Sequence, residues 1–238
     1  MSDLQAVFWD MDGTLVDTEP YWIASEHDLV AAHGGTWSDE QAHLLVGQAL
    51  EYSAAVLQRA GVTMGTTEII DHLTADVAAR CAEQIPWRPG ARQLLEDLHQ
   101  ADVRCALVTM SYKPLAEAIV AALPEGRLEF IVSGDMVTAG KPDPEAYHLA
   151  FDTMASDHQQ RTGEPLRRAQ CIAIEDSVPG TAAAAASGMV TLAVPHYSQL
   201  PETGKWHLLE TLEGVTSEDL AELLHRPVPA ADTAAVGA

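Results

Sequence analysis

Short apolar runs alternate with longer amphipathic runs along most of the chain. The short runs are bounded by Gly, Pro or polar residues and predict buried strands at Ala6–Trp9, Val103–Val108, Phe130–Val132, Cys171–Ile174 and Met189–Val194. The longer runs predict helices at Ala91–Gln100, Pro114–Leu123, Glu145–Met154 and Val178–Ser187. This alternation is typical of a parallel sheet covered by helices on both faces, so we expect an α/β fold with a Rossmann-like sheet.

The stretch from residue 17 to residue 87 departs from this alternation. It has helical patterns but no strand pattern, and its helices are expected at Pro20–His33, Asp39–Val46, Leu50–Ala60 and Glu68–Gln84. We therefore predict an all-helical cap domain of residues 17–87. It is inserted after the first strand of an α/β core domain that comprises residues 1–16 and 88–227.

Two further segments are expected to lack regular structure. Ser156–Ala169 is polar and carries Gly163 and Pro165, which predicts an extended surface loop. Residues 228–238 are rich in Ala, Pro and Gly, and we expect them to form a disordered tail.

Composition narrows the class of partner. The chain has 238 residues, of which 47% are hydrophobic, and a formal net charge of −22. So acidic a surface repels nucleic acids and anionic membranes, and no apolar stretch is long enough to span a bilayer. The start of the chain has no basic region followed by an apolar one, and its three cysteines form no CxxC pair. We expect a cytoplasmic protein, and the sequence says nothing about its oligomeric state.

The first candidate for chemistry is a pair of carboxylates directly after the first strand. Asp10 and Asp12 lie in the segment Asp-Met-Asp-Gly-Thr, where Gly13 permits a turn. The carboxyl end of a strand is where ligands bind in open α/β sheets, and such a pair suits a nucleophile beside a proton donor. By itself the pattern could also be a simple turn or a fragment of a calcium-binding loop. The ligand spacing of an EF-hand, however, is absent.

Three more segments should reach the same edge of the sheet. They are Thr109 after the second strand, Lys141 in Ala-Gly-Lys-Pro-Asp-Pro-Glu, and Glu175-Asp176 after the strand at Cys171–Ile174. Four carboxylates would then converge, and their mutual repulsion requires a cation. Hard oxygen ligands favour Mg²⁺, while Lys141 and Thr109 would complete a cradle for a phosphoryl group.

In their residue patterns and their order along the chain, these four segments resemble the motifs of haloacid dehalogenase-type phosphohydrolases. The resemblance runs from Ala6 to about Val194, and the helical insertion resembles the first type of cap in that family. It implies an Mg²⁺-dependent phosphatase that hydrolyses a small phosphorylated metabolite, such as a sugar phosphate, through an aspartyl-phosphate.

The resemblance also implies residue roles. Asp10 would be the nucleophile, and Asp12 would protonate the leaving alcohol and then activate water. The metal ligands would be Asp10, the main-chain carbonyl of Asp12, and Asp176, with Glu175 in the first shell or supporting it. The phosphate-binding groups would be Thr109, the amide of Met110, and Lys141. In the cap, Leu45-Val-Gly47 resembles a substrate loop of the family, and Gln48 and Glu19 are candidate substrate contacts.

Other functions remain on this fold. A phosphomutase of the β-phosphoglucomutase type is the alternative enzyme. The resemblance implies a histidine in the first cap helix of such mutases, and Trp22 stands at the matching position here. A phosphonate hydrolase would need a cap lysine, and none occurs before Lys113. A non-catalytic binding module would be expected to have lost Asp10 or Asp12. A dehalogenase would need neither Asp12 nor Mg²⁺.

Overall fold

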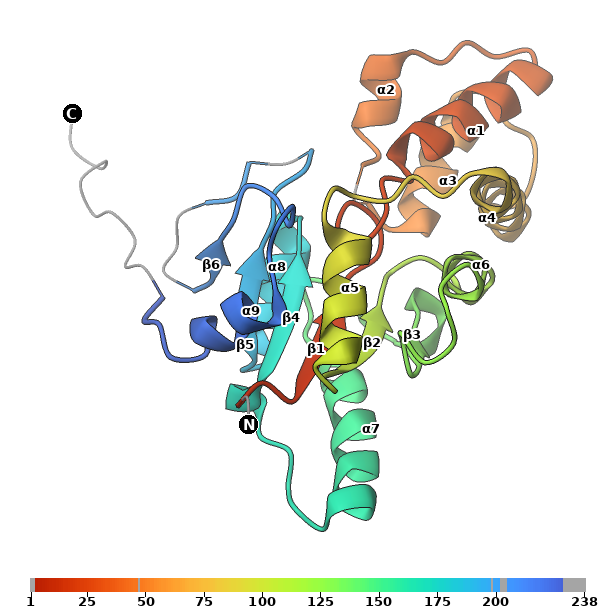
Figure 1. Ribbon diagram of the computed structural model, residues 1–238. Coiled ribbons are helices and arrows are strands. Elements are labelled where there is room, and N and C mark those ends of the chain that lie inside the picture. Colours follow the sequence, from red (N-terminus) through yellow and green to blue (C-terminus); the bar gives the residue numbers. More distant parts are fainter. Residues whose placement is uncertain (1–2, 47, 198, 202–204, 229–238) are drawn as a thin grey trace, which may run out of the picture.

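The computed structural model describes residues 3–46, 48–197, 199–201 and 205–228. Its centre is a parallel six-stranded sheet with the strand order β3-β2-β1-β4-β5-β6 (Figure 1). The strands are β1 (Ala6–Trp9), β2 (Arg104–Val108), β3 (Ile131–Val132), β4 (Cys171–Glu175), β5 (Val190–Ala193) and β6 (His207–Leu208). The predicted parallel α/β sheet is confirmed, and the segments with Asp10, Thr109 and Glu175-Asp176 lie at the ends of its central strands β1, β2 and β4.

Strand side chains alternate between two apolar layers because successive residues of a strand point to opposite faces. On one face, Val7 and Trp9 pack with the helices α5 (Ala91–Gln100), α6 (Lys113–Ala121) and α9 (Ser217–Leu223). On the other face, Ala6 and Phe8 pack with α7 (Glu145–Thr162) and α8 (Val178–Ala186). Both faces of the sheet are thus covered by helices, which leaves the ends of the strands as the part of the sheet that a ligand can reach.

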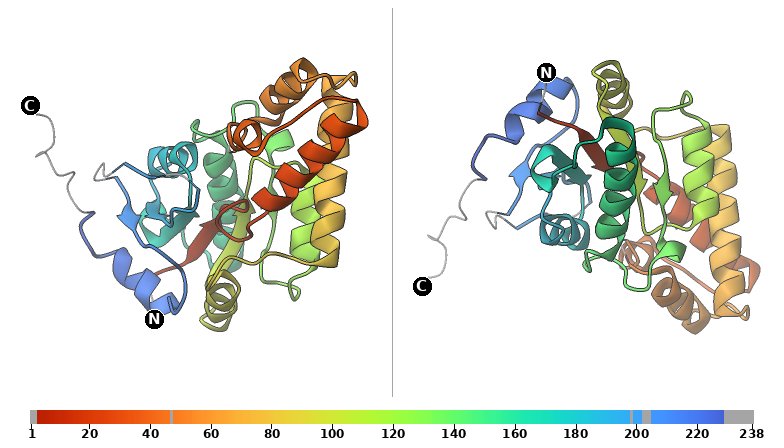
Figure 2. Two further views of the ribbon diagram at one scale, coloured as in Figure 1. Left: turned by 90° about the horizontal axis from the view of Figure 1, so that it is seen from above. Right: turned by 90° about the horizontal axis from the view of Figure 1, so that it is seen from below.

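The helical insertion has an apolar cluster of its own. It consists of α1 (Glu19–Ala32), α2 (Asp39–His43), α3 (Leu50–Arg59) and α4 (Thr66–Glu83), which share buried residues such as Leu29, Leu57 and Leu73. Helix α4 lies beside α6 of the core, as both views of Figure 2 show. Ser38 forms a capping box with Gln41 at the start of α2. The limits of the cap domain at residues 17 and 87 stay a prediction.

The two connections between helices and core run side by side. The amide of Asp17 donates to the carbonyl of Pro86, and Val16 pairs with Trp87 in an antiparallel bridge. The two segments that connect cap and core are therefore paired with each other through their backbones.

The predicted loop at Ser156–Ala169 is wrong over its first half. Helix α7 continues to Thr162 and ends at Gly163, which has a left-handed φ of 79°. The polar last turns lie on the surface, where Asp157 pairs with Arg104 and Arg161. A polar stretch by itself favours a loop, but here the polar side chains belong to a solvated helix stabilised by ion pairs.

Two elements near the C-terminus were not predicted. Strand β6 has only two residues, which is too short to give a pattern, and α9 contributes Leu220 and Leu223 to the core. Of the expected tail, residues 229–238 lie outside the described residues. Within the described chain, we find no helix that is long and apolar enough to cross a membrane.

Candidate active site

Asp10 stands directly after β1, the strand between β2 and β4, and its amide donates to the carbonyl of Ile174. The residue is 6% exposed. One of its carboxylate oxygens, Oδ1, lies 2.6 Å from Nζ of Lys141. The predicted nucleophile is thus buried at the strand ends and paired with a cation.

Lys141 reaches this point from the segment before α7. Besides Asp10, its ammonium contacts Oε1 of Glu175 at 2.7 Å and the carbonyl oxygen of Val108 at 2.9 Å. Burial by itself would lower the pKa of Lys141, but the negative charges of Asp10 and Glu175 outweigh burial and raise it. The lysine is therefore a fixed positive charge at the junction of three strands.

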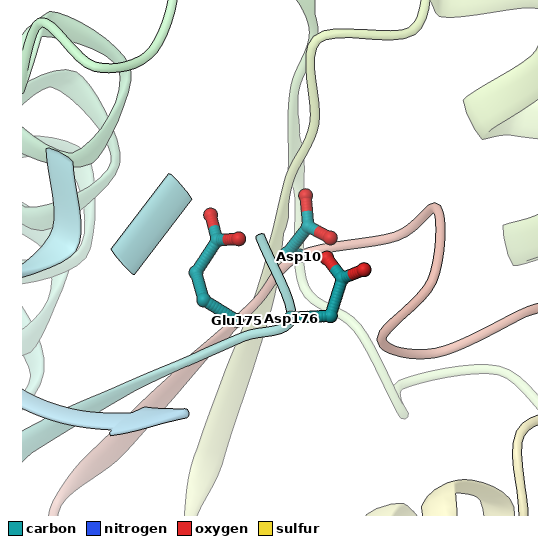
Figure 3. A group of neighbouring side chains, drawn as sticks. All are labelled: Asp10, Glu175 and Asp176. Atoms are coloured by element: carbon teal, nitrogen blue, oxygen red, sulfur yellow. The ribbon is translucent and has the colours of Figure 1, made fainter. Parts of the chain in front are cut away.

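Glu175 ends β4 and Asp176 comes next, and with Asp10 they form a cluster in which one oxygen from each residue lies within 4.8 Å of the others (Figure 3). Burial, followed by the charge of Asp10, raises the pKa of both carboxyls. The hydroxyl of Tyr147 donates to Oε1 of Glu175 at 2.6 Å, whereas the buried Oε2 has no hydrogen-bond partner among the described residues.

This cluster fits a divalent cation. Its donors are carboxylate oxygens, the hard ligands that such ions select, and one of them lacks a partner. Two glycines allow the close packing: a Cβ at Gly13 would lie 2.2 Å from Oδ2 of Asp176, and one at Gly180 would lie 1.8 Å from Oε2 of Glu175. The carboxylate of Asp12 is not part of the cluster.

Asp12 has a different environment from Asp10. Among the described residues, its carboxylate accepts hydrogen bonds only from hydroxyl groups: Thr18 donates to Oδ1, and Thr109 and Ser111 donate to Oδ2 at 3.2 and 2.7 Å. Burial raises the pKa of Asp12 and the charge of Asp10 adds to the rise, although the three hydrogen bonds oppose it. A carboxyl of this kind holds its proton more readily than an exposed aspartate and can donate it to a leaving group.

Two of the predicted phosphate-binding residues, Thr109 and Met110, follow the end of β2, whose last carbonyl, that of Val108, accepts from Lys141. The amide of Thr109 donates to Val132 of β3, and its hydroxyl also accepts from the amide of Ser111. The amide of Met110 has no acceptor among the described residues, and the Met110 sulfur accepts from the amide of Lys141. The structure thus brings Thr109, Met110 and Lys141 around one point beside Asp10.

A cavity of about 500 Å³ opens between these strand ends and the cap helices. Both predicted cap residues line it: Glu19 from the first turn of α1, and Gln48 from the connection before α3. Burial, with the charges of Asp12 and Asp17, raises the pKa of Glu19 to about 7. Gln48 is exposed, and Gly47 of the expected substrate loop lies outside the described residues.

Three residues that contact the site were not predicted from the sequence. Thr18 and Ser111 are not among the predicted site residues, yet both donate to Asp12. Tyr147, which supports Glu175, was not singled out. Ser111 could have been found as the second hydroxyl on the edge that carries Thr109, but nothing local distinguishes Tyr147 from an ordinary apolar position of α7.

Comparisons with known proteins agree with this geometry. Residues 4–188 match the family described as haloacid dehalogenase-like hydrolase. Hexitol phosphatase A of Escherichia coli is 28% identical over 223 residues, which cover 87% of this chain and 91% of the relative. The phosphorylated carbohydrates phosphatase of Thermotoga maritima is 26% identical over 188 residues, covering 78% of this chain and 82% of the relative.

Among solved structures, CbbY from Rhodobacter sphaeroides in complex with phosphate is similar, with a TM-score of 0.79 and 27% identity. The alignment covers 91% of this chain and 99% of the CbbY chain. A mutant of CbbY was solved in complex with xylulose-1,5-bisphosphate, again with a TM-score of 0.79.

Proposed function

We propose that this chain, which belongs to the family of haloacid dehalogenase-like hydrolases, acts through an aspartyl-phosphate on Asp10 and uses Mg²⁺. It is a phosphoric monoester hydrolase, in keeping with relatives named as hexitol and carbohydrate phosphatases. The observation that carries the mechanism is the difference between the two aspartates. Asp10 is paired with Lys141, whereas Asp12 has only hydroxyl partners and a raised pKa.

In the first step, a carboxylate oxygen of Asp10 attacks phosphorus. The bond from phosphorus to Asp10 forms while the ester bond breaks, and Asp12 gives its proton to the departing alcohol oxygen. Lys141, the hydroxyl of Thr109 and the amide of Met110 hold the phosphoryl oxygens, so that charge on them is met by fixed donors. Thr18 and Ser111 orient the carboxyl of Asp12 through their hydrogen bonds.

In the second step, water hydrolyses the intermediate. Asp12, now deprotonated, takes a proton from the water that attacks phosphorus, and the bond to Asp10 breaks to release inorganic phosphate. Asp12 is thereby protonated again and the site returns to its starting state. Both steps need Asp12 to give up and take back a proton, and its raised pKa favours the protonated form that the first step requires.

Mg²⁺ would be held by Asp10, Asp176 and the main-chain carbonyl of Asp12, with Glu175 in the first shell or supporting it. When bound, the ion supplies positive charge to the phosphoryl group and offsets the repulsion within the cluster. Tyr147 and Lys141 fix Glu175 from the other side.

The same site in a phosphomutase would return the phosphoryl group to a sugar. No histidine lines the cavity among the described residues, and Trp22 occupies the corresponding place on α1. We therefore infer transfer to water. The three cysteines are unpaired and buried, which supports a reducing compartment, the cytoplasm, for this reaction.

The test is release of inorganic phosphate from p-nitrophenyl phosphate and from a panel of sugar phosphates, with Mg²⁺ and after EDTA treatment. We expect turnover that requires the metal. A folded protein that releases no phosphate from any ester would instead support a binding module, and full activity after exhaustive metal removal would contradict the role of the carboxylate cluster.

A further inference from the structure

The two segments that join the cap helices to the core are bridged by a third, the loop that follows β5. From this loop, the hydroxyl of Tyr197 donates to Oδ1 of Asp17 at 3.0 Å, and Nε2 of His196 lies 3.1 Å from the same oxygen. Nη1 of Arg88 lies 2.8 Å from Nδ1 of His196, against 3.5 Å from Nε2. We call Asp17, Arg88, His196 and Tyr197 the hinge cluster, because Asp17 precedes α1 and Arg88 follows α4.

The chemistry of these groups determines which nitrogen of His196 carries its proton. A guanidinium can only donate, so the ring nitrogen nearest Arg88, Nδ1, accepts and Nε2 carries the proton. Nε2 then donates to Asp17, whose Oδ1 also accepts from Tyr197. The hydrogen bonds therefore run from Arg88 through His196 to Asp17, and they link the segment that leaves the cap helices to the segment that enters them.

Asp17 is held by its main chain as well as by its side chain. Its amide donates to the carbonyl of Pro86 at 2.7 Å. The next residue, Thr18, is 0% exposed, and its hydroxyl donates to Oδ1 of Asp12. The position of the Thr18 hydroxyl, and with it the orientation of the Asp12 carboxyl, therefore depends on how Asp17 is held.

The hinge cluster lies mostly outside the catalytic cavity. Tyr197 lines the cavity, whereas Asp17, Arg88 and His196 are not among the described residues that line it. A displacement of about 1 Å in a catalytic group can nevertheless cost about a hundredfold in rate, even when the change that causes it is remote. A cluster that reaches the proton donor through two neighbouring residues can therefore affect the reaction without contacting the ester.

We propose that the hinge cluster positions the proton donor of the reaction, with His196 as its central positioning residue. By fixing Asp17 the cluster fixes Thr18, and Thr18 directs the carboxyl of Asp12 toward the oxygen of the leaving alcohol. The inference rests on the proposed function, in which Asp12 is the acid, and extends the site to the loop after β5. Loss of the cluster should impair proton donation rather than binding of the phosphoryl group.

Esters whose leaving groups differ in acidity test this role. The leaving group of p-nitrophenyl phosphate departs readily without a proton, whereas phenyl phosphate and the sugar phosphates depend on the acid. We expect His196→Leu to lower kcat/KM by about tenfold or more for phenyl phosphate and the sugar phosphates, and by no more than about twofold for p-nitrophenyl phosphate. This parameter covers the steps up to departure of the alcohol, so hydrolysis of the intermediate, which is common to all the esters, does not affect it.

Further variants separate positioning from packing. His196→Gln can still donate to Asp17 and accept from Arg88, so it should restore most of the loss. Tyr197→Phe keeps the ring but removes one donor to Asp17, so it should cause the same selective loss by a smaller factor, and it provides the test if His196→Leu does not fold. His99→Leu is the matched control, because His99 is exposed on α5 and does not line the cavity.

A double variant tests the route through Thr18. Thr18→Val removes a donor to Asp12 at nearly unchanged volume, so it should show the same selective loss on the esters with poor leaving groups. Adding His196→Leu should then lower kcat/KM for these esters little further, because residues that act through one contact are not additive. Thermal unfolding checks that each variant is folded.

The outcomes separate this inference from the proposed function. Equal losses on all esters in His196→Leu, or wild-type values on all of them, would overturn the positioning role while the phosphatase function stands. Losses that multiply in the double variant would overturn it as well. If the wild type hydrolyses no ester at all, the proposed function fails and this inference fails with it.

Discussion

At the scale of single residues, two aspartates two positions apart differ because of what surrounds them. Asp10 has a lysine within 2.6 Å, whereas Asp12 has three hydroxyl donors and the negative charge of Asp10 nearby. The environment of Asp12 raises its pKa and so favours the carboxylic acid, whereas Asp10 faces a lysine. One chemical type of side chain can therefore serve as nucleophile and as proton donor in the same site.

The nucleophile is tested by Asp10→Asn. An amide is a poor nucleophile, so phosphate release should fall about a thousandfold or more while the fold is retained. Phosphate release is measured with p-nitrophenyl phosphate, and thermal unfolding checks that the variant is folded. Wild-type kcat in this variant would remove the covalent mechanism altogether.

A second residue-scale prediction concerns the stability of the cap. Burial raises the pKa of Glu26 from its ordinary value of 4.5 to about 8, despite the hydrogen bond from Trp37. The folded state then holds this proton more tightly than the unfolded state. Between these two pKa values, stability should fall as pH rises, by about 1.4 kcal/mol for each pH unit at most.

Glu26→Gln removes this proton linkage and keeps the acceptor for Trp37. The gain in unfolding free energy of the variant over wild type should be small at pH 5 and grow toward pH 8, as measured by urea unfolding at both values. Comparing the two proteins cancels the contribution of the active-site carboxylates. A difference that does not depend on pH would show that Glu26 is ionised in the folded protein at pH 5.

At the scale of elements, the ends of β1 and β4 together form the carboxylate cluster. Asp10 follows β1, Glu175 closes β4, and Asp176 comes next, and hydrogen bonding between the two strands holds them in register. Helix α7 contributes to the same point through Tyr147, and the segment before it through Lys141. No single element carries all of the site residues, so the geometry of the site depends on how the strands of the sheet and α7 pack together.

Metal binding is the prediction at this scale. Mg²⁺ should raise the thermal unfolding temperature of the wild type, because a ligand that binds only the native state stabilises it. Asp176→Ala should abolish most of that shift and raise the Mg²⁺ concentration for half-maximal activity by about tenfold or more. The exposed Asp152 of α7 provides a control variant, Asp152→Ala, which should leave the metal requirement unchanged. An identical metal dependence in Asp176→Ala would exclude this carboxylate as a ligand.

At the scale of the whole molecule, the cap helices close one side of the catalytic cavity. They are joined to the core through residues 16–17 and 86–87, and the core loop after β5 contacts the same place through Tyr197, which donates to Asp17 at 3.0 Å. A site that must admit an ester and then exclude water needs such a cover. We propose that the insertion moves as a unit and selects the leaving group.

The separate roles of the cap and the core are tested by measuring the activity of two variants, Gln48→Ala and Lys141→Ala, on one panel of esters. Gln48→Ala should change the ranking of sugar phosphates by up to about tenfold and affect a minimal aryl phosphate less, because Gln48 lies on the cap side of the cavity. Lys141→Ala should slow every ester alike, by about a hundredfold or more, because it removes the charge beside the phosphoryl group. If Gln48→Ala slows all esters by one common factor, specificity does not depend on this part of the cap.

The sequence by itself determined the order of strands and helices and the residues at the strand ends. Apolar runs, caps and glycines act over a few residues, so they can be read locally, as the capping box at Ser38 illustrates. The motif residues Asp10, Thr109, Lys141 and Asp176 could be expected at one edge because all parallel strands present their carboxyl ends there.

Only the tertiary structure decided which side chains meet. Lys141 and Asp10 are 131 positions apart in sequence, and the donors Thr109 and Ser111 are 97 and 99 positions from Asp12. The last turns of α7 differ from the predicted loop. They are stabilised by an ion pair between Asp157 and Arg104, which lie 53 positions apart, so no local pattern indicates it. Such contacts depend on how distant elements pack, and the free energy of that packing is not encoded in any single stretch of sequence.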